Sequence, residues 1–135
     1  MILVDTSVWI DHLRSNETPP TRTLRKLIEA GEDLATTEPI IMELLAGADT
    51  PPRADALERL TNGLPTLNID SRLDFRQAAA VFLAARRSGR PVRSLTDCLI
   101  AAVALRHDAE LLHDDRDYTA IARCLPLKVY PTLDE

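Results

Sequence analysis

The 135-residue chain has few aromatic side chains and few cysteines. Its aromatic residues are Trp9, Phe75, Phe82, Tyr118 and Tyr130. Because proteins that bind single-stranded nucleic acid often stack its bases on aromatic rings, such a stacking platform is not expected here. The two cysteines, Cys98 and Cys124, lack the paired spacing of metal-binding or disulfide frameworks. We therefore expect neither a disulfide scaffold nor a cysteine-ligated zinc site.

Long apolar segments and an excess of positive charge are also missing. No uncharged run approaches the ~20 residues that a membrane-spanning helix needs, and no basic stretch followed by an apolar segment opens the chain. We expect a cytoplasmic protein without membrane association. The formal net charge is −5, from 16 basic and 21 acidic residues, which argues against a uniformly basic nucleic-acid-binding surface. Nucleic acid stays a candidate partner only where the basic residues cluster.

Strand-like and helix-like segments alternate along the chain. Apolar or alternating runs predict strands at residues 2–4, 34–36, 66–69, 110–113 and 127–130. Periodic segments opened by capping residues or prolines predict helices directly after residues 5–7 and at 21–30, 38–48, 52–62, 71–88, 97–107 and 114–123. This alternation predicts a three-layer α/β/α fold around a central, mostly parallel sheet of four to five strands. With 45% hydrophobic residues, positions 1–135 are expected to form one domain.

Three acidic residues, Asp5, Glu43 and Asp97, each stand alone in an uncharged and mostly apolar stretch. Removing an ionised carboxylate from water costs several kcal/mol unless a cation or hydrogen-bond donors meet it. Glu43 is the most informative of the three, because it lies in the middle of a predicted helix that is apolar nearly all round and should be buried on most sides. The three placements together suggest one shared cation site.

Each of these acids also has a purely structural explanation. Asp5 is placed to cap the helix that follows it, although Thr6 and Ser7 offer hydroxyls for the same purpose. Asp97 lies in the first turn of a predicted helix capped by Thr96, where the macrodipole favours an acid by about 0.3–1 kcal/mol. The structural explanation of Glu43 is a surface glutamate on the one solvent-exposed edge of its helix. From the residues alone, capping, surface exposure and metal binding all stay open.

The densest acidic group, Asp114, Asp115 and Asp117, follows the predicted strand 110–113. A solvated turn with helix caps is one explanation. However, ligands of parallel sheets bind beyond the carboxyl ends of the strands, where Asp5 also lies. Carboxylates within about 4–6 Å raise one another's pKa, and oxygen ligands select Mg²⁺ or Mn²⁺. Such ions activate water and polarise phosphoryl oxygens, which is the chemistry of phosphodiester hydrolysis.

Two further groups of residues are candidates for binding. The densest basic group precedes Asp97 and consists of Arg86, Arg87, Arg90 and Arg93. It is suited to holding phosphates, but a solvated helix end that complements the helix dipole explains it equally well. The first helix carries a large apolar group that consists of Trp9, Ile10 and Leu13. This group suits either core packing or a groove for a partner.

Four segments carry a resemblance to a known family. Their sequences are ILVDTS at residues 2–7, EPIIMELLAG at 38–47, TDCLIAA at 96–102 and HDDRDY at 113–118. In this order, and over nearly the whole chain, they resemble the PIN-domain ribonucleases and specifically the VapC toxins.

The resemblance implies a set of functional residues and partners. The metal-binding and catalytic quartet would be Asp5, Glu43, Asp97 and Asp115. Supporting roles would fall to Asp117 as an auxiliary acid, and to Thr6 and Ser7. The implied activity is Mg²⁺- or Mn²⁺-dependent endoribonuclease cleavage of transfer RNA or another structured RNA, inhibited by a VapB antitoxin. A homodimer and a hetero-oligomer with the antitoxin are the implied assemblies.

Two other functions are compatible with an acidic site. A phosphatase or DNA nuclease would use the same ions, although the D-x-D-x-T pattern of aspartyl-phosphate phosphatases is missing at Asp5. A non-catalytic interaction module would use the acidic pocket to bind an arginine-bearing partner. Metal-dependent turnover of RNA distinguishes the endoribonuclease from both.

Overall fold

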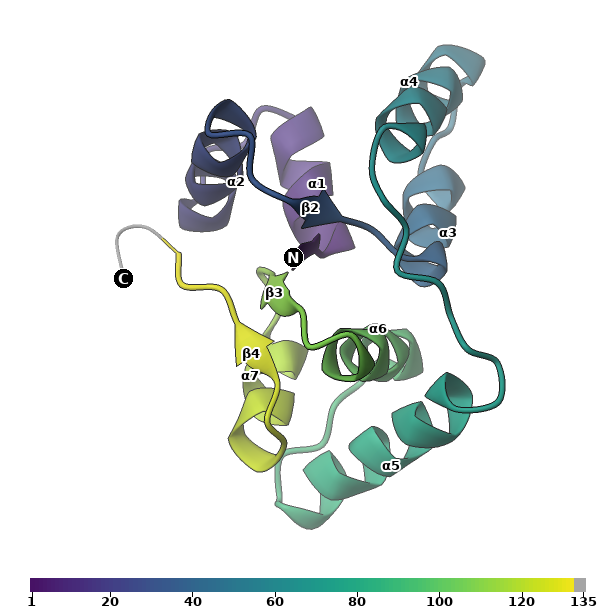
Figure 1. The fold of residues 1–135 in the computed structure, drawn as a ribbon, viewed down its shortest axis with the longest axis vertical. Helices are drawn as coiled ribbons and strands as arrows, with labels where there is room; N and C mark the ends of the chain where they lie inside the picture. Colours follow the sequence, from purple (N-terminus) through teal and green to yellow (C-terminus); the bar gives the residue numbers. More distant parts are fainter. Residues whose placement is uncertain (133–135) are drawn as a thin grey trace.

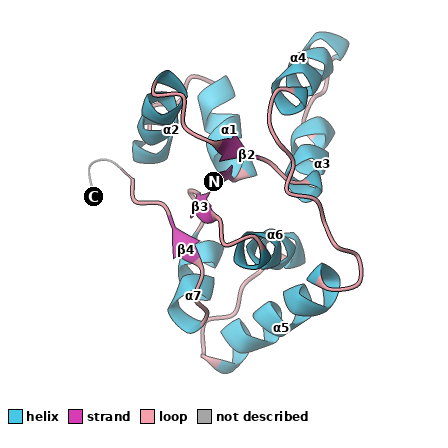
Figure 2. Ribbon diagram, in the orientation of Figure 1, coloured by secondary structure: helices cyan, strands magenta, loops and turns pink. Residues whose placement is uncertain are grey.

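The computed structural model describes residues 1–132; the last three positions of the expected domain, 133–135, lie outside the described residues. A sheet of four strands forms its centre (Figures 1 and 2). The strands are β1 (Ile2–Val4), β2 (Leu34–Ala35), β3 (Glu110–Leu112) and β4 (Lys128–Val129). Their order is β2-β1-β3-β4, and all neighbours run parallel. The predicted α/β class and parallel sheet are confirmed.

Seven helices surround this sheet in the described part of the chain. They are α1 (Thr6–Leu13), α2 (Pro19–Glu29), α3 (Glu38–Ala46), α4 (Pro51–Asn62), α5 (Asp74–Arg87), α6 (Leu95–Arg106) and α7 (Arg116–Cys124). In Figure 1, α1 and α2 lie on one side of the strands and α6 and α7 on the other, while α5 packs outside α6. None of the helices in residues 1–132 has the length and apolar character needed to cross a membrane.

The two central strands are buried because a parallel sheet is covered on both faces. Leu3 pairs with Leu111 and Val4 with Leu112, and all four side chains are fully buried. Helix α6 is largely buried along its middle, from Asp97 to Ala104, and its two end residues, Leu95 and Arg106, are exposed. The sheet and α6 therefore form the rigid part of the molecule, and the candidate acids lie at their ends.

The strand predicted at residues 66–69 is wrong. Only Thr66 forms a parallel bridge, to Thr36, and Leu67 N donates to Thr36 O at 2.8 Å. Beyond this point the backbone leaves the sheet, because Ile69 N donates to the Glu38 carboxylate instead of to a strand (2.9 Å). The segment extends the sheet edge by one bridge and then crosses to α5.

The sequence predicted where helices lie more accurately than the residues at which they begin. The helix expected from residue 71 begins at Asp74, because the Asp70 carboxylate accepts from the backbone of Arg72 and Leu73 and holds a separate turn. Helix α6 begins at Leu95 and is capped by Ser94, not by Thr96. These shifts show that several nearby hydroxyls and carboxylates compete for the same cap.

Helix α3 is less buried than its composition predicts. Met42 is 59% exposed, and Ala46 is also exposed, whereas Ile40 and Leu44 are buried. One apolar face of α3 therefore stays at the surface. An exposed apolar face of this kind commonly marks a contact with another molecule.

An ion pair between a buried carboxylate and a partly exposed guanidinium joins α5 to the end of α6. Asp74 is 1% exposed, and its two oxygens accept from Nε and Nη2 of Arg106, both at 2.8 Å. Arg106 Nη2 also donates to Asn68 O (2.7 Å), and Asp70 N donates to Asp74 (2.8 Å). Burial acts to raise the pKa of Asp74, but these hydrogen bonds and the guanidinium hold it below its ordinary value.

We predict that Arg106→Ala lowers the free energy of unfolding by about 2–4 kcal/mol, because Asp74 is then buried without its cation. Since the folded pKa of Asp74 is depressed, its contribution is present at neutral pH and is lost as pH falls through that folded pKa, below about 4. Urea denaturation at several pH values measures both effects.

Arg25→Ala is the matched control, because the Arg25 pair with Glu17 is about half exposed. Its loss should cost less than about 1 kcal/mol. Equal destabilisation by the two variants would show that the Asp74 pair has no special role.

Candidate metal centre and active site

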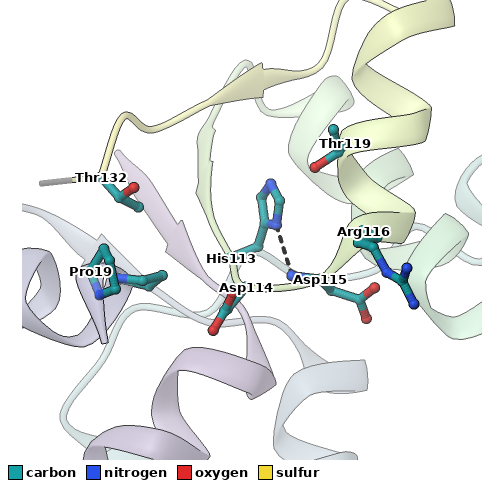
Figure 3. Close-up of a pocket in the computed structure, with 8 residues that line it drawn as sticks. Pro19, His113, Asp114, Asp115, Arg116, Thr119 and Thr132 are labelled. Carbon is teal, nitrogen blue, oxygen red and sulfur yellow. Dashed lines mark hydrogen bonds between the residues drawn. The ribbon is translucent and has the colours of Figure 1, made fainter. Parts of the chain in front are cut away.

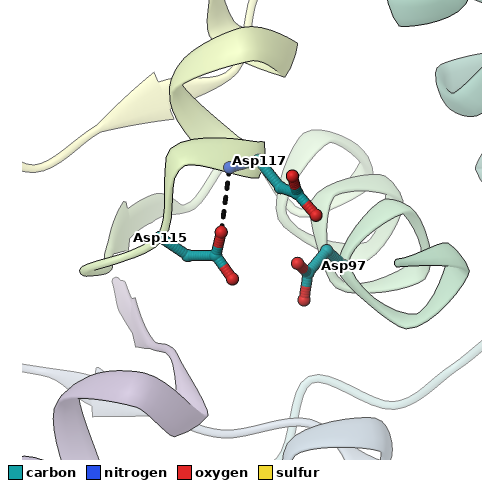
Figure 4. A group of neighbouring side chains, drawn as sticks. All are labelled: Asp97, Asp115 and Asp117. Atoms are coloured by element: carbon teal, nitrogen blue, oxygen red, sulfur yellow. Dashed lines mark hydrogen bonds between the residues drawn. The ribbon is translucent and has the colours of Figure 1, made fainter. Parts of the chain in front are cut away.

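Carboxylates from distant parts of the sequence gather at the carboxyl edge of the sheet. Asp97 lies in the first turn of α6, Asp115 caps α7, and Asp117 lies in the first turn of α7. One oxygen from each lies within 4.8 Å of the others, and Figure 4 shows the three side chains facing a common space. We call these three residues the aspartate trio. The convergence predicted for the acids at this edge is thus observed for Asp97, Asp115 and Asp117.

Asp5 reaches the trio through a buried tyrosine. The Tyr118 hydroxyl lies 2.8 Å from Asp5 Oδ1 and 3.2 Å from Asp97 Oδ1, and the Tyr118 side chain is fully buried. A phenol has one proton, so it donates fully to one carboxylate at a time. Burial raises the pKa of Tyr118 well above its usual range, as do Asp5 and Asp97, so the phenol stays protonated. Tyr118 therefore holds the two acids side by side.

Asp5 caps α1 and also faces the acidic site. Its Oδ2 caps α1 by accepting from Ser7 N (3.1 Å) and also accepts from Ser7 Oγ (2.6 Å). Its Oδ1 faces Tyr118. The suggestion that Thr6 and Ser7 replace Asp5 as the cap is wrong. Ser7 Oγ also accepts from Asp114 N (3.2 Å), and this hydrogen bond connects the start of α1 to the loop after β3.

Glu43 faces this edge from α3 but lies outside the aspartate trio. Thr6 Oγ1 donates to Glu43 Oε1 at 2.8 Å, so the threonine that follows Asp5 orients the glutamate. Burial raises the pKa of Glu43 above its ordinary value; the Thr6 hydrogen bond opposes this, while Asp5 and Asp115 add to it. Glu43 is therefore electrostatically coupled to the other acids.

The pKa of Asp97 lies far above its ordinary value. Burial, followed by repulsion from Asp115 and Asp5, raises its pKa to about 8. Ser94 caps α6 by accepting from Asp97 N (3.2 Å), so the Asp97 carboxylate is not used as a cap. Its position is explained neither by capping nor by solvent exposure, since the residue is 7% exposed.

Asp117, expected as an auxiliary acid, is a full member of the aspartate trio. It is buried, and its Oδ2 accepts from Arg93 N (3.2 Å). Asp115 Oδ1 caps α7 by accepting from Asp117 N (2.9 Å), as Figure 4 shows, which leaves Oδ2 toward the other acids. In residues 1–132, the Arg93 guanidinium, 3.9 Å from Asp117, is the one side-chain cation within ion-pair distance of the trio.

The arrangement fits a divalent cation. Several carboxylates share a partly buried space with one exposed guanidinium, and burial together with repulsion from neighbouring carboxylates raises the pKa of Asp97 and Glu43. All the candidate ligands are carboxylate oxygens, which suit Mg²⁺ or Mn²⁺ and not zinc or copper. Asp97, Asp115 and Asp117 are closest together, and Asp5 and Glu43 border them.

Sequence reasoning missed Tyr118 as part of this site. The residue follows Asp117 directly, and its ring packs in the core with Ile121 one turn later. The available signal was that a buried tyrosine hydroxyl needs a hydrogen-bond partner. Only the fold shows that its partners are Asp5, which follows β1, and Asp97 of α6.

Comparison with known proteins assigns the chain to a family. The model of the PIN domain matches residues 2–123. The chain belongs to the PIN-domain family. It is 47% identical over 129 residues to Ribonuclease VapC11 of Mycobacterium tuberculosis, which covers 95% of this chain and 96% of that protein. This PIN-domain chain is therefore a toxin ribonuclease of the VapC type, an RNA-cleaving hydrolase.

Solved structures share its PIN fold. VapBC2 from Rickettsia felis, bound to a DNA fragment from its promoter, has a TM-score of 0.75 at 16% identity, with 96% of this chain and 98% of that chain covered. VapBC-5 from Mycobacterium tuberculosis, a member of the VapBC family of toxin–antitoxin systems, has a TM-score of 0.64 at 26% identity, with 94% of each chain covered.

We predict that Tyr118→Phe weakens Mn²⁺ binding and RNA cleavage by about 10- to 100-fold, because Asp5 and Asp97 lose the hydroxyl that orients them. Calorimetric titration with Mn²⁺ and the cleavage rate measure the two effects. Thr61→Val is the control, since it also removes a buried hydroxyl, one that donates within α4 to Leu57 O at 2.9 Å and lies outside the acidic site. Unchanged metal affinity in Tyr118→Phe would contradict an orienting role for the hydroxyl.

Proposed function

We propose that this protein is a Mg²⁺- or Mn²⁺-dependent endoribonuclease toxin whose metal is held by Asp5, Asp97 and Asp115 together with Asp117. The observation that carries the proposal is the aspartate trio, whose oxygens lie within 4.8 Å and which Tyr118 links to Asp5. Glu43, expected among the metal ligands, is proposed as the bordering acid. Residues 1–135 are proposed to form one PIN domain.

A divalent ion bound here supplies positive charge at the scissile phosphate and lowers the pKa of the attacking water. The protein's own groups position the ligands and handle protons. Tyr118 keeps its proton and fixes Asp5 beside Asp97. Thr6 orients Glu43, whose raised pKa makes it a better proton acceptor than an exposed glutamate.

The alternative of a non-catalytic acidic pocket for an arginine is less well supported. Arg93 already lies 3.9 Å from Asp117, so an intramolecular guanidinium occupies part of that role. A single further arginine would leave most of the carboxylates without a cation. Two relatives that match 95% and 86% of the chain are named as ribonucleases, which also favours catalysis.

The structure offers a surface for the VapB-type antitoxin. A groove of about 490 Å³ lies between α1, α3 and α4, and Ile10, Leu13, Leu44 and Leu57 line it. Arg14 and Arg53 also line it and supply positive charge. We propose that an amphipathic segment of the antitoxin occupies this groove. Trp9, which the sequence grouped with Ile10 and Leu13, is 1% exposed and belongs to the core.

Assembly and location are part of the proposal. Large exposed apolar side chains occur at Leu73, Phe75, Leu83 and Leu95. They support the predicted homodimer, because apolar surface at and near α5 gains stability when covered. Transfer RNA or another structured RNA is the proposed substrate. A cytoplasmic location is proposed because such RNA is found there.

We predict that Asp97→Asn and Asp5→Asn each lower RNA cleavage by more than about 100-fold, since direct ligands matter more than the groups that orient them. Cleavage of total transfer RNA with Mn²⁺, followed by sequencing of the RNA ends, measures the loss and identifies the target. Excess EDTA should abolish wild-type activity.

Asp55→Asn is the matched control, because Asp55 is an exposed acid on α4. It should cleave at the wild-type rate. Full activity of Asp97→Asn, or wild-type activity in EDTA, would rule out the proposed metal site. Cleavage of DNA or phosphomonoesters in preference to RNA would favour the other metal-dependent hydrolases.

We predict that Leu13→Glu weakens binding of the cognate antitoxin at least tenfold, because a carboxylate is then buried in the apolar groove. Leu13 is 51% exposed in the free chain, so folding should be unaffected. Ile28→Glu is the control, since Ile28 is 46% exposed on α2 and does not line the groove. Equal antitoxin affinity of both variants would place the contact elsewhere.

A further inference from the structure

Two adjoining grooves lie beside the aspartate trio on the side of α7 that faces β4. The first has a volume of about 260 Å³ and begins at Asp115, with Arg116 in its wall. The second has a volume of about 350 Å³ and extends to Arg123 and Tyr130. His113, Thr119 and Thr132 line both grooves, so the two adjoin, and together we call them the α7 channel. Figure 3 shows the residues of the first groove.

The cations of the α7 channel follow one face of α7. Arg116 and Arg123 are seven residues apart, which places them two turns apart on the same side of the helix. Both are exposed, and within residues 1–132 neither has a carboxylate within ion-pair distance. In a chain of net charge −5, two unpaired arginines beside an acidic site are available for an external anion.

The second groove combines charge with an apolar surface, and its lining within residues 1–132 contains no carboxylate. Arg123 and Thr119 contribute a guanidinium and a hydroxyl, and Val129 and Tyr130 contribute an apolar and an aromatic surface. Val129 is 40% exposed. Guanidinium and hydroxyl groups bind phosphate oxygens, and an aromatic ring binds the face of a base. This combination fits a nucleotide.

The charge of the α7 channel changes along its length. Its first groove carries Asp114 and Asp115 next to Arg116, whereas the charged side chain that lines the second groove, among the described residues, is Arg123. A polyanion is therefore repelled at the acidic end unless a metal neutralises it, and is attracted at the other end. This polarity would orient a strand with one phosphate at the metal and its neighbours along α7.

We propose that the α7 channel binds the RNA strand adjoining the scissile phosphate, with Arg116 and Arg123 holding backbone phosphates and Tyr130 contacting a base. The inference rests on the proposed ribonuclease function, since it places substrate at the same acidic site. It also differs from the sequence-based expectation, in which Arg86, Arg87, Arg90 and Arg93 hold the RNA. Arg93 is the member of that group with a contact to the trio, through Asp117.

The test measures binding separately from cleavage. The Asp97→Asn protein is titrated with Mn²⁺ present against a fluorescein-labelled 15-nucleotide single-stranded RNA of mixed sequence, and fluorescence anisotropy gives Kd at several salt concentrations. Adding Arg116→Gln and Arg123→Gln should raise Kd about fivefold each, or about 25-fold together, and flatten the dependence of log Kd on log salt by about 1.4. Arg59→Gln, on the exposed face of α4, should leave Kd unchanged.

Three comparisons decide the outcome. Unchanged Kd and salt dependence in the double variant would overturn the proposal that RNA binds in the α7 channel. If Arg86→Gln and Arg87→Gln weaken RNA binding while the double variant does not, the substrate lies at the end of α5. Restored binding in the Arg116→Lys and Arg123→Lys double variant, with thermal melting unchanged, would support a phosphate contact. Loss of melting temperature without restoration by lysine would show a structural role and overturn the proposal.

The failure of the ribonuclease function is a separate result. If the chain with Asp97 intact cleaves no RNA but the RNA still binds through Arg116 and Arg123, the α7 channel stands and the proposed hydrolysis fails. If that chain cleaves RNA and the two arginines do not affect Kd or KM, hydrolysis stands and the α7 channel fails.

Discussion

Repulsion among carboxylates at the carboxyl edge of the sheet is the constraint on which the site depends. Burial together with Asp115 and Asp5 raises the pKa of Asp97 to about 8, so the fold holds these groups closer than they would lie in water. Tyr118 counters part of the repulsion by placing its hydroxyl between Asp5 and Asp97. A bound cation would remove the rest, which explains why a stable fold keeps these acids together.

The fold meets this constraint by giving single residues two tasks. Asp5 and Asp115 each cap a helix with one carboxylate oxygen, and each has its other oxygen for the site. Ser7 joins the Asp5 carboxylate to the backbone of Asp114. The helix starts and the candidate metal centre are therefore one hydrogen-bonded unit, and a change at a cap also changes the site.

Charge and apolar surface are distributed so that each proposed partner has its own region. The acids occupy the sheet edge, the exposed arginines of α7 lie beside them, and the apolar groove lies between α1, α3 and α4. A net charge of −5 argues against RNA binding when it is averaged over the surface. Local clustering of Arg116 and Arg123 removes that objection, because screening limits electrostatic effects to about 10 Å at ordinary salt.

The sequence by itself determined the strand and helix alternation, the parallel sheet and the edge at which Asp5, Asp97 and Asp115 meet, because periodicity and strand ends are local properties. It did not determine the end of the segment at 66–69, where a side chain of Glu38 took the backbone hydrogen bond. The tertiary structure alone decided that Tyr118 bridges two acids, that Asp117 joins Asp97 and Asp115, and that Glu43 borders them. These are contacts between residues far apart in the chain, and distances between such residues are fixed by packing.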